Sequence, residues 1–158
     1  MRLEDLPLNY QTTVREEHID MMGHMNVMYY TWFTEMATID LYDSLGLNNE
    51  YYAESGCGSF ILEDHTSYLN ELRLGDKVSI YSRLIDRGDK TIHFINFMRR
   101  DRDGALAATA EKIGLHIDMT SRRGAPMPNL ITNRYDALLA QHQALDWGPP
   151  LCGSMGIR

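Results

Sequence analysis

The chain has 158 residues, of which 44% are hydrophobic and 23% are charged, a composition typical of one soluble globular domain. Its formal net charge of −7 gives no support to general binding of nucleic acid or of an anionic membrane surface. The two cysteines are far apart, and neither a signal peptide nor an apolar stretch of membrane-spanning length is visible. These features predict a cytoplasmic protein.

The N-terminal third reads as a strand followed by a long helix. Residues 9–17 are rich in Tyr, Thr and Val, which favours a first strand. Gly23 and Asn26 mark a loop, and Asn26 can cap the helix that begins at Val27. From 27 to 45 apolar residues recur at helical spacing in a wide stripe, so this helix is expected to be mostly buried and to end at Gly46. A short second helix is expected within 48–55.

The next part of the chain is β-prone. Turn signals separate four segments, at 59–69, 76–86, 91–100 and 106–119. An outer helix is expected over 133–144, followed by a loose tail. An antiparallel sheet must bury one face, and the 27–45 helix is the only long apolar element available to cover it. The pattern therefore predicts an α+β fold in which about five antiparallel strands curve around one central helix.

Most of the functional information lies in residues 18–35. His18, Asp20 and His24 surround Gly23 directly in front of the apolar helix, whose N-terminal N–H groups need hydrogen-bonding or anionic partners. A His-x-Asp pair with a second His is also the ligand set of non-haem iron oxygenases. In those enzymes the second His comes from a distant strand, so we expect no metal here.

These residues form the pattern Asp20-x-x-Gly23-His24-x-Asn26, with Tyr30 and Glu35 in the helix behind it. With Tyr68-Leu69 and Leu74-Gly75-Asp76, the pattern resembles the hotdog-fold acyl-CoA thioesterases of the 4-hydroxybenzoyl-CoA thioesterase type over residues 9–128. The resemblance implies a hotdog thioesterase domain over 1–130, followed by a C-terminal helix and loose tail over 131–158.

The same resemblance implies hydrolysis of a small or medium acyl-CoA without a metal or redox cofactor, because coenzyme A is part of the substrate. It further implies a homodimer or a dimer-of-dimers tetramer with sites between subunits. His18-Ile19-Asp20 and Glu63-Asp64-His65 resemble a subgroup that includes betainyl-CoA thioesterases linked to carnitine breakdown.

The resemblance assigns the chemistry to Asp20, as nucleophile on the thioester carbonyl or as general base for water. Backbone N–H groups around residues 23–25 are expected to polarise the thioester oxygen. His24 and Asn26 are expected to shape the loop and to hold Asp20 or the thioester. For Asp20 the alternative is a loop carboxylate that only caps a turn, and for His24 it is a purely structural hydrogen bond.

A second set of residues is expected to contact substrate: His18, Gly23, Tyr30, Glu35, Glu63, His65, Arg87 and Lys90. Glu63 could form a cage for a cationic acyl group with Tyr29, Tyr30 and Trp32. Arg87 and Lys90 flank a hairpin turn and could bind the CoA phosphates. The alternatives are that Glu35 is a structural hub and that the strand and turn residues are simply solvated.

Two other functions are kept open on the same fold. One is a non-catalytic hotdog protein that binds acyl-CoA or acts as a scaffold. The other is an enoyl-thioester hydratase or dehydratase in which His18 or His24 moves the proton.

Overall fold

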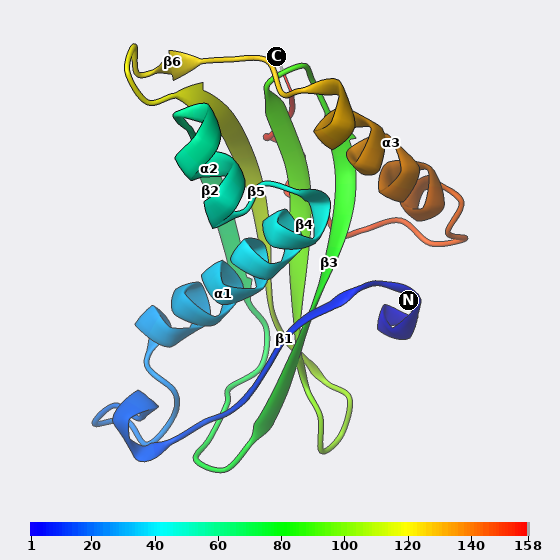
Figure 1. Ribbon diagram of the computed structural model, residues 1–158. Coiled ribbons are helices and arrows are strands. Elements are labelled where there is room, and N and C mark those ends of the chain that lie inside the picture. Colours follow the sequence, from blue (N-terminus) through cyan, green and yellow to red (C-terminus); the bar gives the residue numbers. More distant parts are fainter. Residues whose placement is uncertain (158) are drawn as a thin grey trace.

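The computed structural model describes residues 1–157 as one sheet with three α-helices around it (Figure 1). The helices are α1 (Val27–Leu45), α2 (Asn49–Ser55) and α3 (Asn129–Gln143), with short 3-10 helices η1 (Leu3–Asp5) and η2 (Glu16–His18). The strands are β1 (Leu8–Thr13), β2 (Cys57–Tyr68), β3 (Lys77–Arg87), β4 (Thr91–Arg100), β5 (Leu106–Asp118) and β6 (Arg123–Gly124). None of these helices is long and apolar enough to cross a membrane.

The sheet is antiparallel, and its strand order is β1-β3-β4-β5-β2. The two-residue strand β6 pairs with the end of β5. In Figure 1, α1 lies across one face of the sheet, and α3 lies beside β3 at the opposite edge from β2. The predicted architecture, about five antiparallel strands around a central helix, is confirmed.

Helix α1 begins and ends where its capping residues predict. The Asn26 side chain accepts a hydrogen bond from the Met28 N–H at 2.9 Å, and Gly46 ends the helix in the left-handed conformation with φ of +99°. Its buried face includes Phe33 and Leu41. The expectation of a mostly buried helix is wrong for the opposite face of this single chain, where three large apolar side chains are exposed: Met28, Trp32 and Ile39.

A buried amide fixes α1 against the sheet. Asn96 of β4 donates to the carbonyl oxygen of Thr34 at 3.1 Å and to the hydroxyl of Thr38 at 3.0 Å. Its own carbonyl oxygen accepts from the hydroxyl of Ser82 at 2.8 Å. Because such groups are costly to bury without partners, this network selects one register of α1 on the strands.

Two predicted boundaries differ from the structure. Strand β1 ends at Thr13 instead of residue 17, because residues 16–18 turn into η2. Helix α3 starts at Asn129 instead of 133, directly after Pro128, whose fixed φ suits a helix start.

The residues after α3, expected to be loose, are held to the other face of the sheet. The Trp147 ring packs edge-on against Phe97 at 5.8 Å, and the Arg83 guanidinium lies 4.3 Å from the Trp147 ring. Further along, the Cys152 N–H donates to a Glu111 carboxylate oxygen at 2.7 Å. The covered face therefore includes a buried aromatic cluster instead of open β-sheet.

Candidate active site

Asp20 lies in a tight turn between η2 and α1. The Gly23 N–H donates to the Asp20 carbonyl oxygen at 3.0 Å, and the Met22 N–H donates to the Asp20 carboxylate oxygen Oδ1 at 2.8 Å. Gly23 has a φ of +81°, which favours glycine at that position. The turn therefore fixes one carboxylate oxygen of Asp20 and leaves the other, Oδ2, available.

His24 is the neighbour of that second oxygen. Its Nδ1 lies 3.8 Å from Asp20 Oδ2, and the two side chains are 40% and 22% exposed. The same nitrogen lies 3.3 Å from the Met25 carbonyl oxygen, a contact that requires the proton on Nδ1. Since the distance to Oδ2 is longer than a hydrogen bond, the carboxylate stays open to water or to a carbonyl carbon.

A pocket of about 330 Å³ opens beside Asp20. Its lining comes from the turn, the start of α1 and the segment after β2: Asp20, His24, Met25, Val27, Tyr30, Tyr68, Leu69, Asn70 and Glu71. The Tyr30 hydroxyl accepts from the Leu72 N–H at 3.1 Å and lies 3.4 Å from the Asn70 carbonyl oxygen. Tyr30 therefore ties the segment after β2 to the helix and forms one wall of the pocket.

The backbone N–H groups of His24 and Val27, which both line this pocket, have no partner within residues 1–157. The Gly23 N–H is used in the turn, and the Met25 N–H donates to the Leu72 carbonyl oxygen at 2.7 Å. Of the donors predicted over residues 23–25, the N–H groups of Gly23 and Met25 are therefore occupied within the chain, whereas that of His24 is free. Val27 lines the pocket, and its N–H has no partner among residues 1–157. As the first N–H of α1, it carries part of the positive end of the helix dipole.

His18 lies outside this pocket. The ring is buried against Tyr29 and Phe33, with centroid distances of 4.5 and 5.1 Å. Its Nδ1 accepts from the Arg15 N–H at 3.0 Å, which leaves any proton of a neutral ring on Nε2. This arrangement stabilises η2 under α1. In the described part of the chain, no three His, Cys, Asp or Glu side chains gather as metal ligands.

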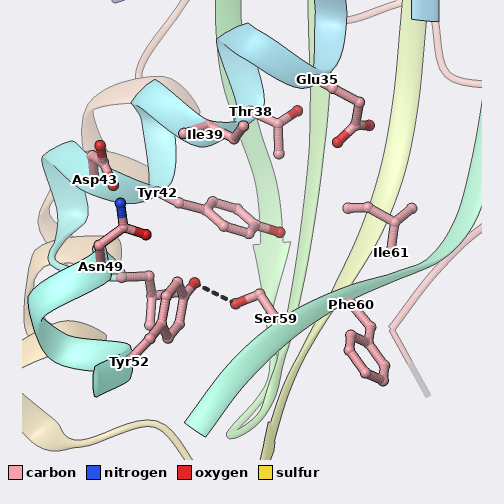
Figure 2. A pocket seen from close by; sticks show the side chains of 11 residues that line it. Glu35, Thr38, Ile39, Tyr42, Asp43, Asn49, Tyr52, Ser59, Phe60 and Ile61 are labelled. Atoms are coloured by element: carbon pink, nitrogen blue, oxygen red, sulfur yellow. Dashed lines mark hydrogen bonds between the residues drawn. The ribbon is translucent and has the colours of Figure 1, made fainter. Parts of the chain in front are cut away.

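Glu35 lies at a second pocket, of about 320 Å³, between α1, α2 and β2 (Figure 2). Its Oε1 accepts from Lys112 Nζ at 2.6 Å, and Lys112 also pairs with Asp64. Lys112 is fully buried, so these carboxylates compensate for the cost of burying its charge. The lining consists of Glu35, Thr38, Ile39, Tyr42, Asp43, Leu47, Asn49, Tyr52, Ser59, Phe60 and Ile61.

Glu63 and His65 are exposed on the edge strand β2 and line neither pocket. A register shift between Ile61 and Glu63 interrupts the pairing with β5. Asp64, which lies between the two predicted residues, is the side chain that pairs with Lys112. Within one chain, the strand therefore contributes Asp64 to the ionic cluster and presents Glu63 and His65 to solvent.

The two predicted phosphate ligands have different surroundings. Arg87 is bound to Asp136 through Nε at 2.6 Å and Nη2 at 2.5 Å, and this pairing raises the pKa of the guanidinium. Lys90 has no carboxylate partner among residues 1–157, and its stem packs beside Gly124. Arg87 is therefore already paired within the chain, whereas Lys90 is free.

The residues that were not predicted as site residues include Tyr68, Asn70 and Glu71 of the Asp20 pocket, and Lys112, which pairs with Glu35 of the second pocket. Tyr68 belongs to the second motif noted in the sequence, and its place at the end of a long strand was the available signal. Lys112 lies in a continuous β-prone segment, where a single lysine ordinarily indicates a solvent-facing position.

The chain was compared with known proteins. The model of the thioesterase-like superfamily matches residues 14–141. A betainyl-CoA thioesterase of Pseudomonas aeruginosa is 29% identical over 136 residues, covering 86% of each chain. An L-carnitine dehydrogenase/betainyl-CoA thioesterase of Agrobacterium fabrum is 30% identical over 98% of this chain and 31% of that protein.

Solved structures give the same result for the fold. A Staphylococcus aureus protein in complex with CoA superposes with a TM-score of 0.86 at 26% identity, covering 97% of each chain. A putative thioesterase from Pseudomonas putida superposes with a TM-score of 0.79 at 26% identity, covering 97% of this chain and 96% of that one. Together with the curved sheet and central helix, these matches confirm the predicted hotdog fold.

Proposed function

Because the chain belongs to the thioesterase-like superfamily and is a thioester hydrolase, we propose that it hydrolyses acyl-CoA with Asp20 as the catalytic carboxylate. Its relatives support a CoA thioester as substrate, since several are betainyl-CoA thioesterases and two similar structures contain CoA. The observation that carries the proposal is the open Oδ2 of Asp20 in a pocket that is also lined by Val27, whose N–H at the helix N-terminus is free.

In this proposal the thioester carbonyl carbon lies near Asp20 Oδ2, and its oxygen accepts from the Val27 N–H. Asp20 either attacks the carbonyl carbon or removes a proton from the attacking water. In both routes the C–S bond breaks, one water molecule is consumed, and a proton from water ends on the CoA sulfur. Asn26 orients the helix terminus by capping it, and His24 limits the positions open to Asp20.

We also propose that two chains associate through β2. This edge strand is twelve residues long and, within residues 1–157, pairs only with β5; exposed edges of this length are ordinarily covered. Large apolar side chains lie on it and on the neighbouring face of α1, between 41% and 60% exposed: Met28, Trp32, Ile39, Phe60, Leu62 and Tyr68. A second copy fits best, because an isologous contact buries both edges at once.

An antiparallel pairing of two β2 strands, centred near Glu63, would set the start of each strand beside the end of the other. Ser59 at the Glu35 pocket would then lie across from the partner's Ser67, next to the partner's Tyr68, which lines the partner's Asp20 pocket. The Glu35 pocket of one chain would thus extend the Asp20 pocket of its partner and receive the acyl group.

The contents of the Glu35 pocket favour a cationic acyl group such as betainyl. Tyr42, Tyr52 and Phe60 contribute aromatic side chains to the lining, and no Lys or Arg lines it (Figure 2). Glu35 is paired with Lys112, whereas Asp43 has no ion pair in residues 1–157. The cage expected from Glu63, Tyr29, Tyr30 and Trp32 is not assembled in one chain, since Tyr29 packs on His18.

Thiol release from a panel of acyl-CoA substrates tests the function. Betainyl-CoA is compared with 3,3-dimethylbutyryl-CoA, which has the same shape without the positive charge. We expect kcat/KM to be about 2- to 30-fold higher for betainyl-CoA, the range of a cation–π contribution. Binding of acyl-CoA without thiol release from any substrate would favour the non-catalytic alternative, and hydration of an enoyl-CoA would favour the hydratase alternative.

The association through β2 makes its own prediction. Leu62→Lys places a charge on the exposed edge and is expected to reduce the dimer to single chains, because burying an unpaired charge is costly. Light scattering at micromolar concentration measures the mass. Leu130→Lys is the matched control, since Leu130 is also exposed but lies on α3 away from β2. Equal masses for the two variants would contradict the proposed interface.

A further inference from the structure

The positive charges of this acidic chain are unevenly compensated. Eight of the Lys and Arg side chains in residues 1–157 lie within 4.0 Å of a carboxylate: Arg2, Arg15, Arg73, Arg87, Arg99, Arg100, Arg102 and Lys112. Arg83 donates instead to two backbone carbonyl oxygens. The remaining free cations of this part of the chain are Lys77, Lys90, Arg122, Arg123 and Arg134.

Three of these free cations gather at one end of the sheet. Arg123 belongs to β6, which pairs with the end of β5, and the Lys90 stem packs on the adjacent Gly124. The Arg122 guanidinium lies 5.3 Å from the ring of Phe60 on β2. Lys90, Arg122 and Arg123, here called the basic end, are all exposed.

Asp118, which pairs with Arg123 in the sheet, and Asp89 lie by the basic end but form no ion pair with it within 4.0 Å. An oxygen of the Asp118 carboxylate accepts from the N–H and the hydroxyl of Ser121, at 2.6 and 2.8 Å. Arg122 is the one non-glycine residue in 1–157 with a positive φ, 57°. Such conformations concentrate at ligand-binding positions.

We infer that Lys90, Arg122 and Arg123 bind the phosphates of the CoA whose thioester is cleaved at the partner's Asp20. The inference rests on the proposed function and on the antiparallel β2 pair. CoA carries a diphosphate and a 3′-phosphate, and clustered exposed guanidinium and ammonium groups are the side chains that bind such groups. This assignment differs from the one expected from the sequence. Arg87 is already paired with Asp136, and its place as a phosphate ligand is taken by Arg122, before β6, and Arg123, in β6.

The topology explains why the basic end of one chain is expected to serve the Asp20 pocket of its partner and not that of its own chain. Within one chain, Phe60 and Tyr68 are eight residues apart on β2, a span of about 26 Å. In a pair centred near Glu63, Phe60 lies across from the partner's Thr66, close to the partner's Asp20 pocket. The basic end then flanks the pocket mouth through which the pantetheine arm must leave.

Substrates with and without the nucleotide test this assignment. Arg122→Gln and Arg123→Gln are each expected to raise KM for acyl-CoA about tenfold, the effect of losing one charge-assisted hydrogen bond, with kcat unchanged. KM for the same acyl group on N-acetylcysteamine should not change, because that thioester has no phosphate. The control Lys77→Gln removes an equal charge from β3 and should change neither KM.

Other outcomes separate the two proposals. Unchanged KM for acyl-CoA in both Arg variants, or an equal increase with the N-acetylcysteamine thioester, overturns the phosphate assignment. If the wild type hydrolyses neither thioester, the proposed function fails, and calorimetric binding of CoA to the same variants still decides the assignment. Loss of the variant effect with 3′-dephospho-CoA would identify the 3′-phosphate as the group that is bound.

Discussion

Asp20→Asn is expected to lower kcat for acyl-CoA hydrolysis about a thousandfold, the order of effect seen when a positioned general base is lost. Asparagine keeps the oxygen that accepts the Met22 N–H, so the turn and its stability should be preserved. What is lost is the negative charge at Oδ2, the atom that the turn leaves open. Thiol release under saturating substrate gives kcat, and thermal unfolding shows that the variant is folded.

The control for this variant is Glu17→Gln, which removes a charge three residues away. Glu17 is exposed and has only a 3.8 Å contact with Arg15, so its replacement should leave kcat unchanged. Retention of most of the wild-type kcat by Asp20→Asn would rule out the assigned role.

A single turnover in ¹⁸O-labelled water distinguishes the two roles of Asp20. As a nucleophile, Asp20 forms an acyl anhydride, and when water opens it at the Asp20 carbonyl carbon the first acid product keeps an Asp20 oxygen and is unlabelled. As a general base, it directs labelled water to the carbonyl carbon, and the first product carries ¹⁸O. An unlabelled first product therefore identifies the nucleophilic role, whereas opening of the anhydride at the acyl carbon gives a labelled product, as general-base catalysis does.

The fold was predictable because its main signals are local. Asn26 and Gly46 define α1 to the residue, since capping depends on a few neighbouring backbone groups. The strand boundaries follow turn residues in the same way. Strand β1 was overestimated because Arg15 and Glu17, although next to a strand-like run, enter a 3-10 turn that His18 stabilises through the Arg15 N–H.

The candidate site was predictable only in its local half. Asp20, Gly23, His24 and Asn26 lie within seven residues and share one turn and cap. The opposite wall comes from residues 68–71, which Tyr30 holds across more than forty positions. The periodicity of apolar residues in the sequence cannot predict such a long-range contact, because the contact depends on how β2 and β5 pair.

Long-range charge pairing explains two other differences between the sequence-based expectations and the structure. Arg87 looked free in a turn but meets Asp136 from α3, 49 residues later. Lys112 looked like a surface residue of a strand but is buried between Glu35 and Asp64. The exposed apolar face of α1 has a related origin. An apolar helical pattern does not distinguish a face that is buried within the chain from one that a second chain would cover.

Gly114→Ala is expected to destabilise the protein by about 1–3 kcal/mol or more, the usual cost of overpacking a core. A Cβ at this position of β5 would lie 2.0 Å from the hydroxyl oxygen of Tyr42. The Tyr42 ring cannot easily move, because it packs edge-on against Phe94 with centroids 5.8 Å apart. Urea unfolding measures the change in the free energy of unfolding, and Gly148→Ala is the control, since nothing lies within 4 Å of its Cβ position.

The second substitution, Tyr42→Phe, should rescue the first. The Tyr42 hydroxyl is buried without a hydrogen-bond partner in residues 1–157, and this burial raises its pKa far above the usual range. Removing the hydroxyl alone should therefore be neutral or stabilising by up to about 1 kcal/mol. In the double variant the alanine Cβ meets ring carbon Cζ at 3.3 Å, a tight contact that small shifts can relieve. A double-mutant cycle should give a favourable coupling energy, and additive effects would mean that Gly114 is required for a reason other than the Tyr42 hydroxyl.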